Sequence, residues 1–204
     1  ELSPIHMPLA KKIYQFPGLP ELTFRGLPGM IADALPDDFG NAVLNAWIAS
    51  QGRRPQDISP LNRLQYTGSR GMGALEFYPA TAMKGFSAEE SIQIESLVAV
   101  AQEVLDQREN FNINLGAASS TDQDAMLALL SVGTSAGGAR PKAVLAFNQD
   151  FTLVRSGQAS LPEGFTHYIM KFDGVTEHRA GRETFGDPMG YGAMEYTYYQ
   201  MAKD

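Results

Sequence analysis

The residues best suited to chemistry in this sequence form one block of ten, Gly133 to Lys142. The block reads Gly-Thr-Ser-Ala-Gly-Gly-Ala-Arg-Pro-Lys, and a strand-like run follows it at once. Glycine lets backbone N–H groups approach a ligand, and successive N–H groups form a concavity that binds anions. Arg140 and Lys142 add positive charge. The block is therefore either a phosphate-binding loop between strands or a glycine-rich hairpin with a basic edge.

Two common phosphate motifs are excluded. A Walker A loop requires Gly-Lys-Ser/Thr at its end, but Ala139 and Arg140 follow Gly138. The Gly-x-Gly-x-x-Gly pattern of dinucleotide-binding folds does not occur in the block either. A glycine loop followed by a lysine on a later strand is the arrangement of protein kinases. Asp38-Phe39-Gly40 spells the kinase magnesium triplet, but it precedes the loop and is interpreted as a helix start.

A strand lysine and a helix glutamate follow the glycine block. Residues 166–172 alternate like a strand, so Lys171 shares one face with His167 and Ile169. Lys171 is either a ligand of nucleotide phosphates or an edge-strand lysine that reaches water. Asp187-Pro188 predicts a helix start, and Glu195, 24 residues after Lys171, lies in its second turn. Glu195 either holds the lysine or is a solvated helix glutamate.

Other segments must position these residues. Helices are expected over residues 28–35, 38–50, 60–66 and 87–108, the second capped by Asp37-Asp38 and the third with Leu61 and Leu64 inward. The fourth begins with a capping box, Ser87 to Glu90. Strands are expected over 74–78, 142–147 and 151–155 as well as 166–172. The small, polar residues 110–121 predict a boundary between two units, and the fold class is α+β.

The composition argues against several kinds of ligand and binding site. The 204 residues carry a net charge of -7, which makes nucleic acid a poor direct ligand. No cysteine is present, so disulfides and thiolate metal sites are excluded, which is compatible with a reducing cytoplasm. No apolar run approaches the ~20 residues of a membrane span. The three histidines show no metal-ligand spacing. Both ends of the sequence resemble the interior of a protein, so we expect them to be cut.

Five segments, in this order, resemble the HipA family of serine/threonine kinase toxins, and the resemblance covers essentially the whole chain. They are Leu35 to Gly40, Gly71 to Phe77, Ser135 to Lys142, His167 to Lys171, and Glu195-Tyr196. The block Ser-x-Gly-Gly-Ala-Arg-Pro-Lys is the most specific. The resemblance implies a HipA-like N-terminal subdomain over residues 1–117. A mostly antiparallel kinase small lobe with the glycine-rich loop would follow over 118–204.

The resemblance also implies roles for individual residues. Ser135 matches the regulatory autophosphorylated serine, and Lys171 matches the nucleotide-binding lysine. The ATP-phosphate loop matches a run that contains Gly137, Gly138, Ala139, Arg140 and Lys142. Family members use ATP and Mg²⁺, are neutralised by HipB-type antitoxins, and have glutamyl-tRNA synthetase as their best-known target.

The chain departs from the family pattern in two places. Met194 stands where the family often has asparagine before the helix glutamate. The family's catalytic aspartate and magnesium ligands lie in a C-terminal lobe, and no matching segment follows Lys171, so no catalytic or metal-binding residue is assigned. We expect this chain alone to be inactive. The alternative is a non-catalytic interaction module whose glycine loop is structural.

Overall fold

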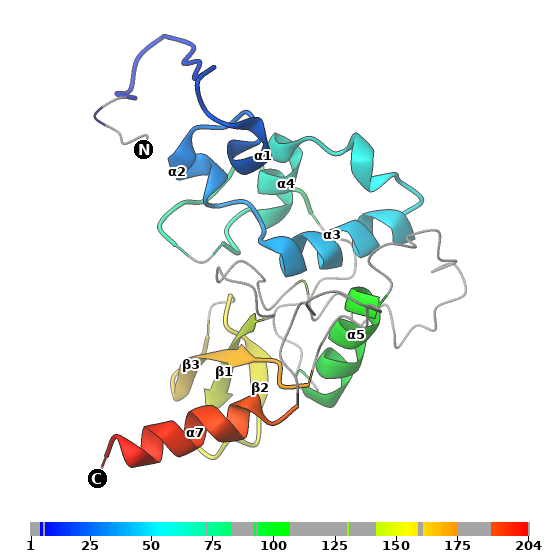
Figure 1. Ribbon diagram of the computed structural model, residues 1–204, viewed down its shortest axis with the longest axis vertical. Coiled ribbons are helices and arrows are strands. Elements are labelled where there is room, and N and C mark those ends of the chain that lie inside the picture. The colour runs from blue at the N-terminus through cyan, green and yellow to red at the C-terminus, as the bar shows by residue number, and fades with distance from the viewer. Residues whose placement is uncertain are drawn as a thin grey trace.

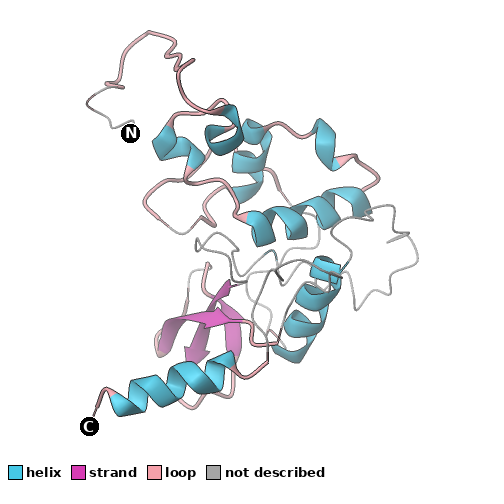
Figure 2. Ribbon diagram, in the orientation of Figure 1, coloured by secondary structure: helices cyan, strands magenta, loops and turns pink. Residues whose placement is uncertain are grey.

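The computed structural model describes residues 5, 7–71, 73–82, 92, 94–106, 130, 142–158, 161–174 and 189–203. The N-terminal part is helical, and a small antiparallel sheet and a last helix follow it (Figure 1 and Figure 2). The helices are α1 (Glu21–Phe24), α2 (Gly29–Ala32), α3 (Asp38–Ser50), η1 (Pro55–Asp57), α4 (Pro60–Thr67), α5 (Ile94–Asp106) and α7 (Tyr191–Met201). The strands are β1 (Lys142–Asn148), β2 (Val154–Ser156) and β3 (Phe165–Lys171), in the order β2-β1-β3. The expected α+β class is confirmed.

Helix α3 has the bounds that the sequence predicts. The Asp37 side chain caps it by accepting a 2.7 Å hydrogen bond from the Gly40 N–H. Most of its residues are buried, including Phe39, Val43 and Trp47. A helix that is apolar nearly all round must be covered on several sides. Helix α3 is therefore the centre of the N-terminal half.

An arginine clamps α4 onto α3. The Arg63 guanidinium donates to the side-chain oxygens of Asn41 and Asn45 at 3.0 and 2.8 Å, and to the Pro55 carbonyl at 3.2 Å. Burial lowers the pKa of Arg63, and the neighbouring Arg25 lowers it further. These three acceptors are neutral amide oxygens, so amide dipoles solvate the charge of Arg63.

Two expectations for this half are wrong. Residues 74–78 do not form a strand; instead, the N–H groups of Phe77 and Thr81 donate to the carbonyls of Gly68 and Gln65 in and beyond α4. Backbone N–H groups in and just after this segment therefore pair with carbonyls at the C-terminal end of α4 and not with a neighbouring strand. Leu61 is 61% exposed, although Leu64 is buried as expected.

The β1–β2 hairpin is shorter than the sequence predicts. The Asn148 side chain accepts hydrogen bonds from the N–H groups of Thr152 and Leu153, at 2.9 and 2.8 Å. Phe151 takes a left-handed conformation with φ 55°. These features widen the turn, so β2 begins at Val154 rather than at residue 151.

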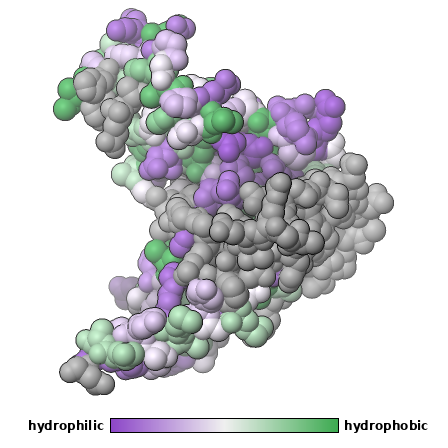
Figure 3. All heavy atoms as spheres, in the orientation of Figure 1, coloured by the Kyte–Doolittle hydropathy of each residue, from purple (hydrophilic) through white to green (hydrophobic). Residues whose placement is uncertain are grey.

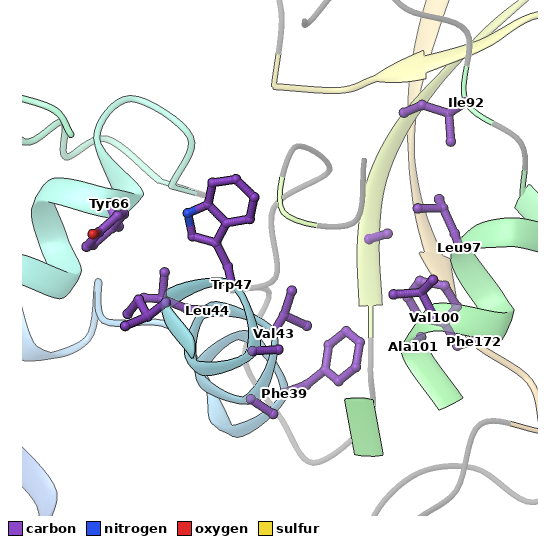
Figure 4. Close-up of a cluster of buried hydrophobic side chains, with 14 of the residues drawn as sticks. Phe39, Val43, Leu44, Trp47, Tyr66, Ile92, Leu97, Val100, Ala101 and Phe172 are labelled. Atoms are coloured by element: carbon purple, nitrogen blue, oxygen red, sulfur yellow. The ribbon is translucent and has the colours of Figure 1, made fainter. Parts of the chain in front are cut away.

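One hydrophobic core joins the two expected units. Phe39 of α3 lies 5.9 Å from Phe172, measured between ring centroids, and both residues are 1% exposed. Leu97 and Ala101 of α5 and Leu145 of β1 complete this centre, as Figure 4 shows for the residues it labels. The predicted apolar stripe of α5 is confirmed at Ile94, Leu97, Val98 and Ala101. Its expected capping box and the boundary at 110–121 lie outside the described residues.

Helix α7 begins later than predicted. It starts at Tyr191, after Gly190 with φ 101°, and not at Asp187-Pro188, which lie outside the described residues. A left-handed glycine cannot continue a right-handed helix, which sets the start. Within the described part of the chain, no helix is both long and apolar enough to cross a bilayer.

The shared core predicts that α3 and the sheet lose stability together. Replacing Phe172 with alanine removes a fully buried ring and should cost about 3–5 kcal/mol of unfolding free energy. Amide hydrogen exchange should speed up in α3 as well as in β1. The control Phe151→Ala removes a ring that is 61% exposed and should cost far less. Faster exchange confined to the sheet would show that the two units are independent.

Candidate phosphate-binding site

One face of the three-stranded sheet packs on the core, and the other, called here the polar face, carries Lys142, His167 and Lys171 beside the apolar Val144, Ala146 and Ile169, of which Val144 and Ala146 are buried. Strands β1 and β3 pair so that Leu145 lies opposite Tyr168 and Ala143 opposite Met170. Side chains of directly opposed residues share a face, and these belong to the face toward the core. The other face carries the pairs Lys142–Lys171, Val144–Ile169 and Ala146–His167. The predicted grouping of His167, Ile169 and Lys171 on one face is consistent with this register.

The two lysines of the polar face lie directly opposite each other. Lys142 begins β1 and Lys171 ends β3, and their Cα atoms are partners in the ladder. Like charges in such a pair repel each other. The sheet therefore concentrates positive charge at one end of its polar face, where the chain enters from the glycine block.

Glu195 of α7 holds the strand lysine. The Lys171 Nζ lies 2.7 Å from both carboxylate oxygens of Glu195. The side chains of Lys171 and Glu195 are 42% and 47% exposed, and β3 is an edge strand of the described sheet. An exposed ion pair contributes only ~0–1 kcal/mol to stability. Because both side chains are exposed, water could solvate each charge without the other. The main physical effect of the ion pair is therefore to fix where the ammonium group points.

Lys142 lies near the cap of α3. Its positive charge lowers the pKa of Asp37, but burial is the larger effect and the pKa of that carboxyl is raised overall. The sequence identified Asp37 as a helix cap and did not predict that it would lie beside the last residue of the glycine block. Asp37 and Lys142 are 105 residues apart in the sequence, so no local sequence pattern could predict that they lie close together.

A further contact at this site was not predicted from the sequence. Asp173 follows the strand by two residues, and both of its carboxylate oxygens accept from the Gly190 N–H before α7, at 3.1 and 3.2 Å. The Asp173-Gly174 dipeptide is a turn signal in the sequence. That signal indicates the turn and gives no indication of the helix that the carboxylate meets.

The remaining predicted site residues lie outside the described residues. They are Ser135, Gly137, Gly138, Ala139 and Arg140. Their roles stay predictions. Among the described residues, no group of three histidine, aspartate or glutamate side chains is placed to hold a metal ion.

The family model of the HipA N-terminal domain matches residues 1–78. This match supports a HipA family protein with an N-terminal subdomain. No curated protein and no solved structure matches the chain. The matched residues fall within the unit expected over 1–117, and the boundary between the two units stays a prediction.

The raised pKa of Asp37 predicts a pH dependence of stability. Folded Asp37 keeps its proton to a higher pH than the unfolded chain, whose carboxyl titrates near 3.8. The folded state then binds more protons in that window, so this group's contribution falls as pH rises through it. Asp37→Asn keeps the cap and removes the titration, whereas Asp37→Ala should lose about 1 kcal/mol throughout.

Denaturant unfolding at several pH values from 3.5 to 7 measures this effect. The control is Asp33→Asn, which removes an exposed carboxylate from the preceding turn. An Asp37→Asn protein with the parent's pH profile would contradict the assignment.

Proposed function

We propose that this chain is the N-terminal part of an ATP-dependent serine/threonine kinase of the HipA type. The match over residues 1–78 supports the HipA family and its toxin–antitoxin context. The single observation that carries the kinase proposal is the Lys171–Glu195 ion pair directly across the sheet from Lys142. Active protein kinases require a strand lysine held by a helix glutamate.

The lysines fit a polyphosphate ligand. An ammonium group has three donors, and two N–H···O contacts hold Lys171 to Glu195. The third donor would serve an α- or β-phosphate oxygen. Lys142 would add a second cation at the same end of the face. When bound, Mg²⁺ neutralises developing phosphate charge, and its ligands belong to the C-terminal lobe that the family resemblance implies.

Regulation and partners follow from the same proposal. Phosphate on Ser135 would place about two negative charges in a loop that otherwise attracts anions. The loop would then be displaced and ATP excluded. We further propose a cytoplasmic location, a HipB-type antitoxin as partner, and a protein substrate such as glutamyl-tRNA synthetase. ATP contacts from Gly137, Gly138, Ala139 and Arg140 belong to this proposal.

The exposed helix α7 favours a second function. No residue of α7 is buried, and several large apolar side chains on and beside it are exposed, including Met189, Tyr196 and Met201. Figure 3 shows apolar atoms over this helix at the lower end of the view. A non-catalytic interaction module would use such a helix for binding, with a structural glycine loop. ATP binding separates the two functions.

In the full-length protein, Lys171→Ala should weaken Mg·ATP binding by about tenfold or more, because the strand cation would no longer meet the phosphates. Isothermal titration calorimetry measures the affinity. Lys203→Ala removes a lysine from the end of α7, where it lies over Tyr199, and should leave the affinity unchanged. Equal affinities for the parent and Lys171→Ala proteins would favour the interaction module.

In the full-length protein, Ser135→Asp should lower the affinity for Mg·ATP, whereas Ser135→Ala should not, because only the former adds a negative charge. The same titration measures both variants. Normal Mg·ATP binding by Ser135→Asp would rule out the proposed inhibition by phosphate.

A further inference from the structure

Helix α7 is held to the sheet by polar contacts. None of its described residues is buried, so it has no apolar face packed on the core. Its contacts with β3 and the following turn include the Lys171–Glu195 ion pair and the Asp173–Gly190 hydrogen bonds. Amphipathic helices normally owe their position to a buried stripe. Both carboxylates therefore contribute to the position of α7.

Phe172 fixes the direction of both lysine and aspartate. It lies between Lys171 and Asp173 in the chain, and its ring is buried against Phe39. The core thus anchors the backbone at the one residue that separates the two polar contacts. Lys171 and Asp173 therefore contact α7 from a segment of backbone that the core holds in place.

The start of α7 is shaped to receive the Asp173 carboxylate. Gly190 has a left-handed φ of 101°, a conformation that favours glycine, and its N–H donates to both oxygens. A Cβ on Gly192 would lie 3.3 Å from Asp173 Oδ2, closer than ordinary van der Waals contact. Negative charge at a helix N-terminus is also favourable. The first turn of α7 and the Asp173 side chain are therefore complementary.

We propose that Asp173 is a positioning residue for Lys171, because its carboxylate fixes the start of α7 and thereby brings Glu195 to the lysine. The role of Lys171 in binding phosphate rests on the proposed function. Asp173 touches no reacting atom and acts through α7. Without it, the start of α7 would lose its hydrogen bonds to the Asp173 carboxylate, and an exposed ion pair such as Lys171–Glu195 is weak by itself.

Chemical labelling of lysines tests the proposal without any nucleotide. Acetic anhydride reacts with the neutral amine, so the ion pair with Glu195 should slow labelling of Lys171. Mass spectrometry gives the rate for Lys171 relative to Lys203 in the same molecule. Asp173→Ala should raise this ratio several-fold, close to its value in Glu195→Gln. Asp173→Asn keeps one acceptor oxygen for the Gly190 N–H but loses the negative charge, so it should give a ratio between those of the parent and Asp173→Ala.

The matched control is Asp150→Ala, which removes an equal charge from the exposed β1–β2 turn. A second readout uses spin labels at Ile169→Cys and Tyr198→Cys, since the sequence has no cysteine of its own and both side chains are exposed. Asp173→Ala should broaden the distance distribution between these labels, and Asp150→Ala should not. If the distance distribution broadens while Asp173→Ala keeps the parent's denaturant unfolding transition, global unfolding is excluded as the cause.

Two results would overturn the proposal: an unchanged Lys171 ratio in Asp173→Ala, or an unchanged distance distribution in the same variant. The outcome is separable from the fate of the kinase proposal. A full-length protein that binds no ATP in any variant refutes the phosphate site, whereas the labelling and distance data still decide whether Asp173 positions α7.

Discussion

The contact between Phe39 and Phe172 links the two halves of the described structure. Phe39 lies in the first turn of the buried helix α3, and Phe172 directly follows β3, the strand that carries Lys171. Because both rings are almost fully buried, the sheet cannot shift relative to α3 without opening the core. This apolar contact therefore sets the position of the polar face relative to α3. The N-terminal subdomain is thus part of the support for the candidate site.

The candidate site combines strong and weak constraints. Strands β1 and β3 are joined by a seven-residue register, which fixes Lys142 opposite Lys171. Helix α7 has no buried residue and is attached through carboxylates. Rigid strands thus carry the cations, and a helix attached by polar contacts carries the group that orients one of them. Such a division suits a site in which a lysine is fixed for binding while its partner helix can respond to other parts of a protein.

The acidic groups around the lysines have different roles. Glu195 contacts Lys171 directly, Asp173 holds the helix start, and Asp37 caps α3 near Lys142. Burial raises the pKa of Asp37, so its ionised form is maintained at some cost to stability. Lys142 partly offsets that cost. The end of the glycine block is therefore coupled electrostatically to the subdomain that matches the HipA family.

The sequence by itself determined the local elements and the α+β class. Asp37 before an apolar run predicted α3 with its bounds, and alternation predicted β3 to within one residue. These succeed because capping and side-chain periodicity act over a few residues. Tertiary structure decided the rest. Residues 74–78 form no strand, and the Phe77 N–H donates instead to the Gly68 carbonyl after α4. The left-handed Gly190 makes α7 begin at Tyr191. The proximity of Asp37 to Lys142 and of Asp173 to Gly190 depends on how the chain returns through one shared core, and spacing along a sequence does not encode that path.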